Sequence, residues 1–132
     1  MRRNMDLIRS LVLKLEELDM EPGSMVMVLE HEIESQFAVD AFTSAEILYH
    51  YHLIVEKGWA DGGKYGLSHQ GIYFRKLTSD GHDFADSVRD PQIWKATKEG
   101  ALKAGGFSLD LLSQLAKGYL QKKIEQHTGI SL

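Results

Sequence analysis

The segment from Thr43 to Trp59 constrains the fold most, because the sequence marks both ends of a single helix within it. Thr43 followed by Glu46 is a capping-box pattern, in which two side chains satisfy backbone N–H groups at the start of a helix. Gly58 suits the left-handed conformation that ends many helices, and an apolar residue such as Trp59 often follows it in a Schellman motif. We therefore predict a helix over residues 44–57.

Two further elements are predicted before this helix. Asn4 is placed to cap a helix in which apolar residues recur at helical spacing between residues 5 and 18. The unbroken apolar run Met25–Leu29 is too short for a core helix and predicts a buried strand. Residues 30–42 show no clear pattern, and we expect an irregular or briefly helical link there.

A hairpin and then helices are predicted in the second half of the chain. Glycines interrupt residues 60–71, and the β-favouring run Ile72–Leu77 follows them, which indicates two strands around a flexible, wing-like loop. Three helices are then expected: residues 79–89 after the cap Thr78, residues from Pro91 to about 104 before two glycines, and residues after the cap Ser108.

These elements together predict the fold class α+β, mainly α. We expect one domain, with a winged-helix-like core and a short antiparallel β-hairpin wing in residues 1–90, and additional C-terminal helices packed on the core in residues 91–132. The length of 132 residues, with 43% apolar and 26% charged residues, is typical of a single globular domain. The sequence has no cysteine and no apolar run near the ~20 residues that span a bilayer, so we expect a cytoplasmic protein with no membrane partner.

The charge distribution limits the partners that the chain is expected to bind. The net charge is −4, and residues 1–58 hold five basic and eleven acidic residues, whereas residues 91–132 hold six basic and three acidic ones. Proteins that bind nucleic acid through phosphates normally present a basic surface. Any phosphate contact is therefore expected from the second half of the chain.

The exposed face of the helix over residues 44–57 is the first candidate site. Helical spacing places Glu46, Tyr49, Leu53 and Glu56 on one side of this helix. The opposite, core-facing side holds Ile47, Leu48, Tyr51, Ile54 and Val55. A face that reads DNA bases usually offers Arg, Lys, Asn or Gln, and this one offers none of them. A surface that binds a protein partner, a merely solvated surface and a DNA-reading surface all remain open at this stage.

Two other segments hold candidate nucleic-acid contacts, which are basic residues and one tyrosine. These residues are Lys64, Tyr65, Arg75 and Lys76 in the hairpin, with His69 in its loop, and Lys117, Lys122 and Lys123 in the last helix. We expect the three lysines to form a basic side opposite the leucines of that helix. A solvated hairpin is the plainer interpretation of the first group. The last helix is equally suited to packing on its own domain or on a second copy in a homodimer.

Enzyme chemistry has little support in the sequence. His82 and Asp86 have the i, i+4 spacing of two metal ligands, with Asp83 adjacent, but two ligands are too few for a site. The chain has no HExxH pattern, no phosphate-binding P-loop and no dinucleotide fingerprint. We expect no catalytic residue, metal or cofactor, and we expect His50 and His82 to be polar groups satisfied at the edge of the core.

Five segments resemble an uncharacterised bacterial and bacteriophage family, the domain-of-unknown-function family numbered 2513. They are residues 2–9, 49–58, 77–84, 88–94 and 106–110, and the Gly-His-acidic-Phe and Arg-Asp-x-x-x-Trp pieces carry most of the specificity. The acidic link at residues 30–34 and the glycine-rich hairpin depart from the family pattern. The resemblance implies a winged-helix-like fold and a phage or prophage setting, with no known activity to carry over.

From the residues and this resemblance we predict a noncatalytic, phage- or prophage-associated winged-helix protein that acts by binding. A protein partner or self-association is the first expectation. The alternative is a DNA-binding transcriptional regulator that uses the wing and the basic last helix.

Overall fold

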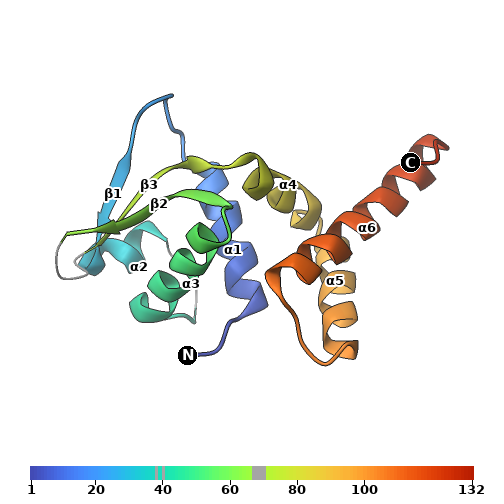
Figure 1. Ribbon diagram of the computed structural model, residues 1–132, viewed down its shortest axis with the longest axis horizontal. Coiled ribbons are helices and arrows are strands. Elements are labelled where there is room, and N and C mark those ends of the chain that lie inside the picture. Colours follow the sequence, from blue (N-terminus) through green and yellow to red (C-terminus); the bar gives the residue numbers. More distant parts are fainter. Residues whose placement is uncertain (38, 40, 67–70) are drawn as a thin grey trace. The chain divides into compact units, whose positions relative to one another are not determined.

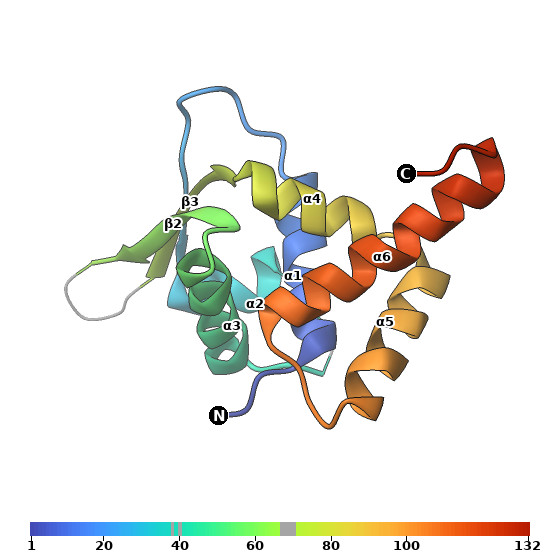
Figure 2. The same cartoon turned by 45° about the vertical axis from the view of Figure 1, so that its right-hand side comes forward.

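The computed structural model describes residues 1–37, 39, 41–66 and 71–132, and the chain divides into an N-terminal unit, Met1–His82, and a C-terminal unit, Asp83–Leu132. Figures 1 and 2 show the order of the elements along the chain. They are α1 (Met5–Glu17), β1 (Val26–Leu29), the 3-10 helix η1 (Glu30–Glu32), α2 (Ile33–Gln36), α3 (Ser44–Glu56), β2 (Ala60–Tyr65), β3 (Gly71–Leu77), α4 (Ser79–Val88), α5 (Pro91–Lys103) and α6 (Leu109–Thr128). This composition confirms the predicted class, α+β and mainly α.

The N-terminal unit is built from a three-stranded antiparallel sheet with α1, α2 and α3. The strands lie in the order β1-β3-β2, and the hairpin that joins β2 to β3 is the one expected from the sequence. The core comes from one face of each element and includes Leu7, Ile8, Leu11, Leu15, Ile33, Ile47, Tyr51, Ile54, Ile72 and Phe74. The short helices η1 and α2 occupy the first part of the link at residues 30–42, where an irregular or briefly helical segment was expected.

β1 is not the buried strand that its apolar run predicts. Val28 is 2% exposed, but Met27 is 51% exposed and Met25, just before the strand, is 45% exposed. Successive residues of a strand point to opposite faces of the sheet, and here only one face is covered. The run therefore supplies one core residue and leaves its methionines on the outer face of the sheet.

Both ends of α3 have the predicted capping geometry. The Thr43 side chain accepts the backbone N–H of Glu46, and the Glu46 side chain accepts the N–H of Thr43 in return. At the other end Gly58 has a φ of +83°, and the N–H of Trp59 donates to the carbonyl of Ile54 across 3.1 Å. This is the Schellman arrangement, which satisfies carbonyls that the helix itself leaves open.

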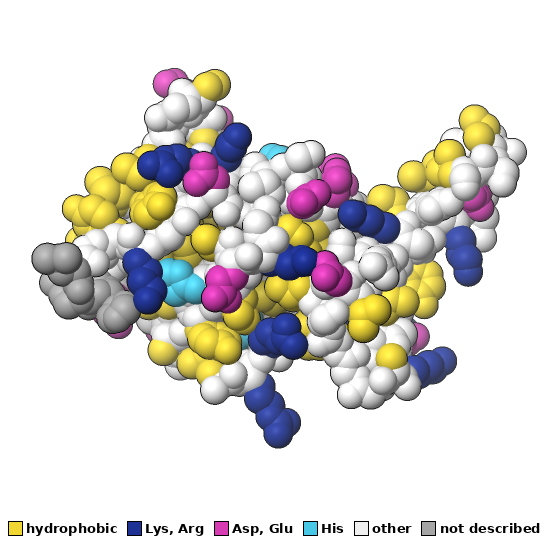
Figure 3. Space-filling view, viewed as in Figure 1, with side chains coloured by type: hydrophobic (Ala, Val, Ile, Leu, Met, Phe, Trp, Pro, Cys, Tyr) yellow, Lys and Arg dark blue, Asp and Glu magenta, His cyan; other side chains and the backbone are white. Residues whose placement is uncertain are grey.

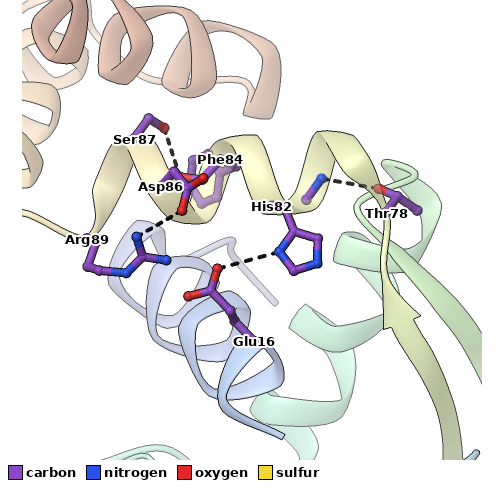
Figure 4. A network of polar contacts seen from close by, with 8 residues as sticks. Glu16, Thr78, His82, Phe84, Asp86, Ser87 and Arg89 are labelled. Atoms are coloured by element: carbon purple, nitrogen blue, oxygen red, sulfur yellow. Dashed lines mark hydrogen bonds and ion pairs between the residues drawn. The ribbon is translucent and has the colours of Figure 1, made fainter. Parts of the chain in front are cut away.

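Thr78 connects the end of α3 to the start of α4. Its hydroxyl donates to the carbonyl of Gly58 across 2.5 Å and accepts the N–H of Gly81 across 3.1 Å, while its own N–H donates to the carbonyl of Trp59. Figure 4 shows Thr78 at the first turn of α4. The predicted cap is confirmed, and it fixes where the chain leaves the sheet.

The C-terminal unit contains the second half of α4 and a hairpin of α5 and α6. Asp90 caps α5 through the N–H groups of Gln92 and Ile93, with proline at the first helical position, and Ser108 caps α6. Asp90 also accepts a hydrogen bond from Lys123, late in α6, so the two helices run antiparallel. No helix within the described residues has the length and apolar character needed to span a membrane.

Candidate functional site

The exposed side of α3 carries most of the face predicted from the sequence. Tyr49 is 39% exposed, Glu56 is exposed and Leu53 is half-buried, while the opposite side of the helix is buried in the core. We refer to Tyr49, Leu53 and Glu56 as the α3 surface. An aromatic ring, a leucine and a carboxylate on neighbouring turns offer apolar contact area with one acidic group beside it.

Glu46, the fourth member of the predicted face, has a structural role. Its Oε1 accepts from both the backbone N–H and the hydroxyl of Thr43 across 3.1 Å, and its side chain is only partly exposed. The carboxylate therefore caps the start of α3. A charge change at Glu46 alters the cap as well as the surface, so Glu56 is the better residue for a test of binding.

His50 is a buried polar group, as expected. It is 1% exposed, its Nε2 accepts the backbone N–H of Asn4 across 2.8 Å, and its Nδ1 lies 2.7 Å from the carbonyl of Glu46. Because Nε2 accepts, Nδ1 carries the hydrogen and donates to that carbonyl. His50 thus ties the capping residue of α1 to α3.

The same expectation is wrong for His82. Its side chain is 54% exposed, and its Nδ1 lies 3.6 Å from Oε2 of Glu16 on α1 (Figure 4). Helical periodicity explains the difference, because Gly81 and Phe84 take the buried positions of α4 and His82 falls between them on the outside.

The hairpin presents fewer available positive charges than its composition suggests. Lys64, Tyr65 and Lys76 are exposed. Arg75, also exposed, lies 3.5 Å from the carboxylate of Asp61 and sits over the ring of Tyr73, 5.1 Å from its centre. Its charge is therefore shared with an acidic group on the neighbouring strand, and His69 lies outside the described residues.

An outer sheet face was missed by the sequence reasoning. Met27 pairs with Tyr73 across β1 and β3, and Gly63 of β2 lies beside the same tyrosine, whose ring would be 3.0–3.2 Å from a Cβ at the glycine. Figure 3 shows hydrophobic side chains gathered over these strands. The alternation of methionine and valine in residues 25–28 was the available signal, and it was obscured because every residue in the run is apolar.

Tyr51 anchors α3 to the sheet from the core side. Its hydroxyl donates to the carbonyl of Tyr73 across 2.5 Å. Gly62 lies beside this hydrogen bond, and a Cβ there would overlap both the Tyr51 hydroxyl and the Tyr73 carbonyl oxygen. Burial raises the pKa of Tyr51 above its ordinary value, and the nearby Tyr73 and Asp61 act in the same direction. The hydroxyl therefore acts as a neutral donor that holds the helix and the sheet together.

The three lysines of α6 do not gather on one basic side. Lys117 is exposed beside Asp83 and Asp86 in an open groove, Lys122 borders a separate apolar groove, and Lys123 is half-buried and donates to Asp90. At 100° per residue, positions 117, 122 and 123 point in three directions around the helix. The expected basic stripe is not present.

The apolar residues of α6 are divided between faces as well. Leu112 is fully buried, Leu111 is 51% exposed and Ile124 is 40% exposed. Leu111, Leu115 and Tyr119 line one groove, whereas Leu120 and Ile124 line the groove beside α4. The leucines therefore do not form the one side, opposite the lysines, that was expected from the sequence.

The residues considered for metal or catalytic chemistry take ordinary surface positions. Asp86 accepts from the guanidinium of Arg89 across 2.9 Å (Figure 4). Asp83 is exposed. Within residues 1–37, 39, 41–66 and 71–132, no group of three or more His, Asp or Glu side chains is arranged to hold a metal ion.

Comparisons with known proteins identify relatives without a described activity. The profile of a family described as "Hypothetical protein (DUF2513)" matches residues 2–108. An "Uncharacterized protein" of Haemophilus influenzae is 29% identical over 126 residues, which cover 94% of this chain and 99% of the relative. No solved structure matches the chain. The family match ends at the cap of α6.

Proposed function

The chain belongs to the DUF2513 family of hypothetical proteins, and we propose that it is a noncatalytic winged-helix module that binds a protein partner through the α3 surface. The order of its elements supports the winged-helix assignment. A helix, a strand, a short helix, a second long helix and a two-stranded hairpin follow one another, and the first strand joins the hairpin at β3. In this arrangement α3 is the helix that would face a DNA groove.

The composition of α3 carries the preference for protein over DNA. Its 13 residues, Ser44–Glu56, include no Lys, Arg, Asn or Gln, which are the side chains that most often contact bases and phosphates. Its exposed side instead holds Tyr49 and Glu56. Tyrosine is enriched at protein interfaces, because its ring buries a large area at low entropic cost while its hydroxyl stays hydrated.

The proposal includes the phage or prophage setting that the sequence resemblance implies. A survey of the genes that adjoin family members tests this part. Neighbouring structural or regulatory phage genes in most genomes support it, and neighbouring housekeeping genes in most genomes contradict it.

Affinity purification with matched variants tests the protein-binding role. The full chain is immobilised as wild type, as the double variant Tyr49→Ala/Glu56→Lys, and as the control Glu99→Lys, which makes the same charge change at an exposed site on α5. We expect proteins that bind the wild type and the control and are lost from the double variant. Equal retention by all three proteins contradicts an α3 partner surface.

DNA binding through the hairpin is the second candidate, and one observation favours it. Lys64 and Lys76 are exposed on adjoining strands, where a hairpin can follow a phosphate backbone. If this function holds, Lys64→Ala/Arg75→Ala/Lys76→Ala weakens binding to duplex DNA and flattens its salt dependence. Unchanged binding by that variant removes the hairpin from consideration.

A further inference from the structure

β1 is an open edge of the sheet in the N-terminal unit. Among the described residues it has a strand neighbour on one side only, because the strands lie in the order β1-β3-β2 (Figure 1). A Cβ at Gly71 of β3 would overlap the carbonyl oxygen of Val28, so that carbonyl points toward β3. Backbone directions alternate along a strand, and the carbonyls of Met27 and Leu29 therefore point to the open side. The N–H of Leu29 donates to Oε1 of Glu32 across 3.1 Å.

The β1 edge lacks the features that protect the opposite edge. β2 has a bulge between Asp61 and Gly62 and carries the exposed Lys64. A bulge or a lysine discourages another strand from pairing with an edge. The pairing of β1 with β3 is regular over Val26–Leu29, the four residues are all apolar, and Met27 is 51% exposed. β1 is therefore the edge of this sheet on which a further strand can form.

The chain around this edge is acidic. Residues 15–56 include ten Asp and Glu residues and no Lys or Arg. Exposed carboxylates flank β1 along the chain, at Glu21 before the strand and at Glu30 directly after it. Arg75, the basic residue of β3 that lies across from the start of β1, is 3.5 Å from the carboxylate of Asp61. A strand that adds to β1 therefore meets negative charge toward each end.

An open groove continues from the C-terminal end of β1. It has a volume of about 520 Å³ and is lined by Leu29, Glu30, His31 and Ser44. Leu29 is the last residue of the strand, so an extended chain laid along β1 in either direction reaches this groove with one of its ends. The exposed carboxylate of Glu30 lies there to meet a basic side chain.

The same charges disfavour a second copy of β1 as the added strand. Two antiparallel copies paired about Met27 would bring Glu30 of each copy toward Glu21 of the other. Two parallel copies would bring the Glu30 residues together. Like charges that face each other destabilise a strand pair, whereas lysine or arginine at these places forms opposite-charge contacts. The charge pattern therefore fits a basic chain and not this one.

From the open edge, its apolar residues and the carboxylates around it, we propose that β1 binds an extended, basic segment of another protein as a fourth strand of the sheet. Backbone hydrogen bonds to Met27 hold the segment, and the exposed Met25 and Met27 side chains contact its apolar residues. Glu21 and Glu30 select basic residues toward its ends. This edge is not part of the α3 surface, and the inference does not depend on the proposed function.

A labelled peptide of about eight residues that alternates lysine and valine serves as the probe, because alternate residues of an added strand share a face. Fluorescence anisotropy follows its binding to the full chain, titrated up to ~200 µM at ~50 mM salt. We expect saturable binding, at least about tenfold tighter than that of a peptide that alternates glutamate and valine. No binding of the lysine peptide, or equal binding of the two peptides, overturns the proposal.

Methylation of the peptide backbone separates strand addition from simple charge attraction. Two versions of the lysine peptide carry N-methyl groups on every second amide, in the two possible phases, so that each keeps its charge and side chains but loses half of its backbone donors. An added strand uses the donors of one phase, so at least one version should bind about tenfold more weakly. If both versions bind as tightly as the unmodified peptide, no strand is added.

Two variants locate the site on β1. Met27→Lys and Glu30→Lys should each weaken binding of the lysine peptide at least about fivefold, with unchanged helical content by circular dichroism. Their controls are Leu102→Lys, at a residue on α5 that is 66% exposed, and Glu99→Lys, which makes the same charge change at an exposed site. Both controls should bind as the wild type does. Binding that survives in both β1 variants, or that falls equally in the controls, overturns the assignment to this edge.

Discussion

The backbone of Gly81 lies against the carbonyl of Trp59, at the point where the end of α3 meets the start of α4. A Cβ at Gly81 would overlap that carbonyl, with its carbon atom 2.9 Å away. The same carbonyl accepts the N–H of Thr78 across 3.0 Å, so it cannot turn aside without losing a hydrogen bond. Gly81 belongs to one of the two motifs that carry the family resemblance, and this contact gives a physical reason for glycine in it.

Gly81→Ala should destabilise the protein by about 2–4 kcal/mol, because overpacking against a fixed backbone forces α4 or the hairpin to shift. Urea denaturation followed by circular dichroism measures the change. Gly118→Ala is the matched control, since it makes the same substitution inside a helix where space is open. A loss of less than about 0.5 kcal/mol in Gly81→Ala would show that the close approach is not required.

His50→Leu should lower the free energy of unfolding by about 1–3 kcal/mol, because the N–H of Asn4 loses its acceptor at a similar side-chain volume. Chemical denaturation at neutral pH provides the measurement. The control is His31→Leu, at an exposed histidine of η1. Equal stability of the two variants would contradict a tie between α1 and α3 through His50.

Tyr51→Phe removes the hydrogen bond to the carbonyl of Tyr73 and should cost about 1 kcal/mol at pH 7. Because burial holds the pKa of Tyr51 above its ordinary value, the unfolded chain ionises first, near pH 10. The stability that the buried hydroxyl contributes is complete below pH 10 and declines as pH rises further.

The midpoint of thermal unfolding, measured between about pH 8 and pH 11, separates the contribution of the Tyr51 hydroxyl from that of other titrating groups. The midpoint of Tyr51→Phe should fall less steeply with pH than that of the wild type. Tyr65→Phe, at a residue that is 41% exposed, should follow the wild-type slope. Parallel slopes for all three proteins would place the Tyr51 hydroxyl in contact with solvent.

The substitution Asp90→Asn removes one negative charge at the start of α5. The hydrogen bond from Lys123, followed by that from the N–H of Gln92, holds the pKa of Asp90 below its ordinary value. Stability from the ionised group is therefore present above about pH 4 and is lost as pH falls through the lowered pKa. Asparagine caps helices as well as aspartate does, so the variant keeps the cap.

Acid unfolding followed by circular dichroism tests this linkage. Between about pH 5 and pH 2 the wild type should lose more stability than Asp90→Asn. Identical acid profiles would show that Lys123 does not stabilise the charged form.

Local signals allowed most of the fold to be predicted. Each cap joins groups only a few residues apart, so the pairs Thr43–Glu46 and Thr78–Gly81 can be recognised from spacing alone. The burial of a strand depends instead on which face of the sheet another element covers. The exposure of Met27 therefore could not be predicted from the apolar run in which it lies.

The candidate site was predictable only in part for the same reason. Tyr49 and Glu56 follow from helical periodicity, which is local. The acceptor role of His50 depends on Asn4, 46 residues earlier. Arg75 could not be discounted as a phosphate contact until Asp61 and Tyr73 were placed around it by the register of β2 and β3.

Titration of labelled random duplex DNA with the full chain, followed by fluorescence anisotropy, tests the central claim most directly. At ~50 mM salt several phosphate contacts would give clear binding, and at ~200 mM they would cost orders of magnitude in affinity. Because α3 has no Lys or Arg and the exposed lysines of the hairpin and α6 do not form one basic side, the account predicts no binding at either salt concentration. Tight binding at ~50 mM that collapses at ~200 mM would contradict it and would identify a DNA-binding protein.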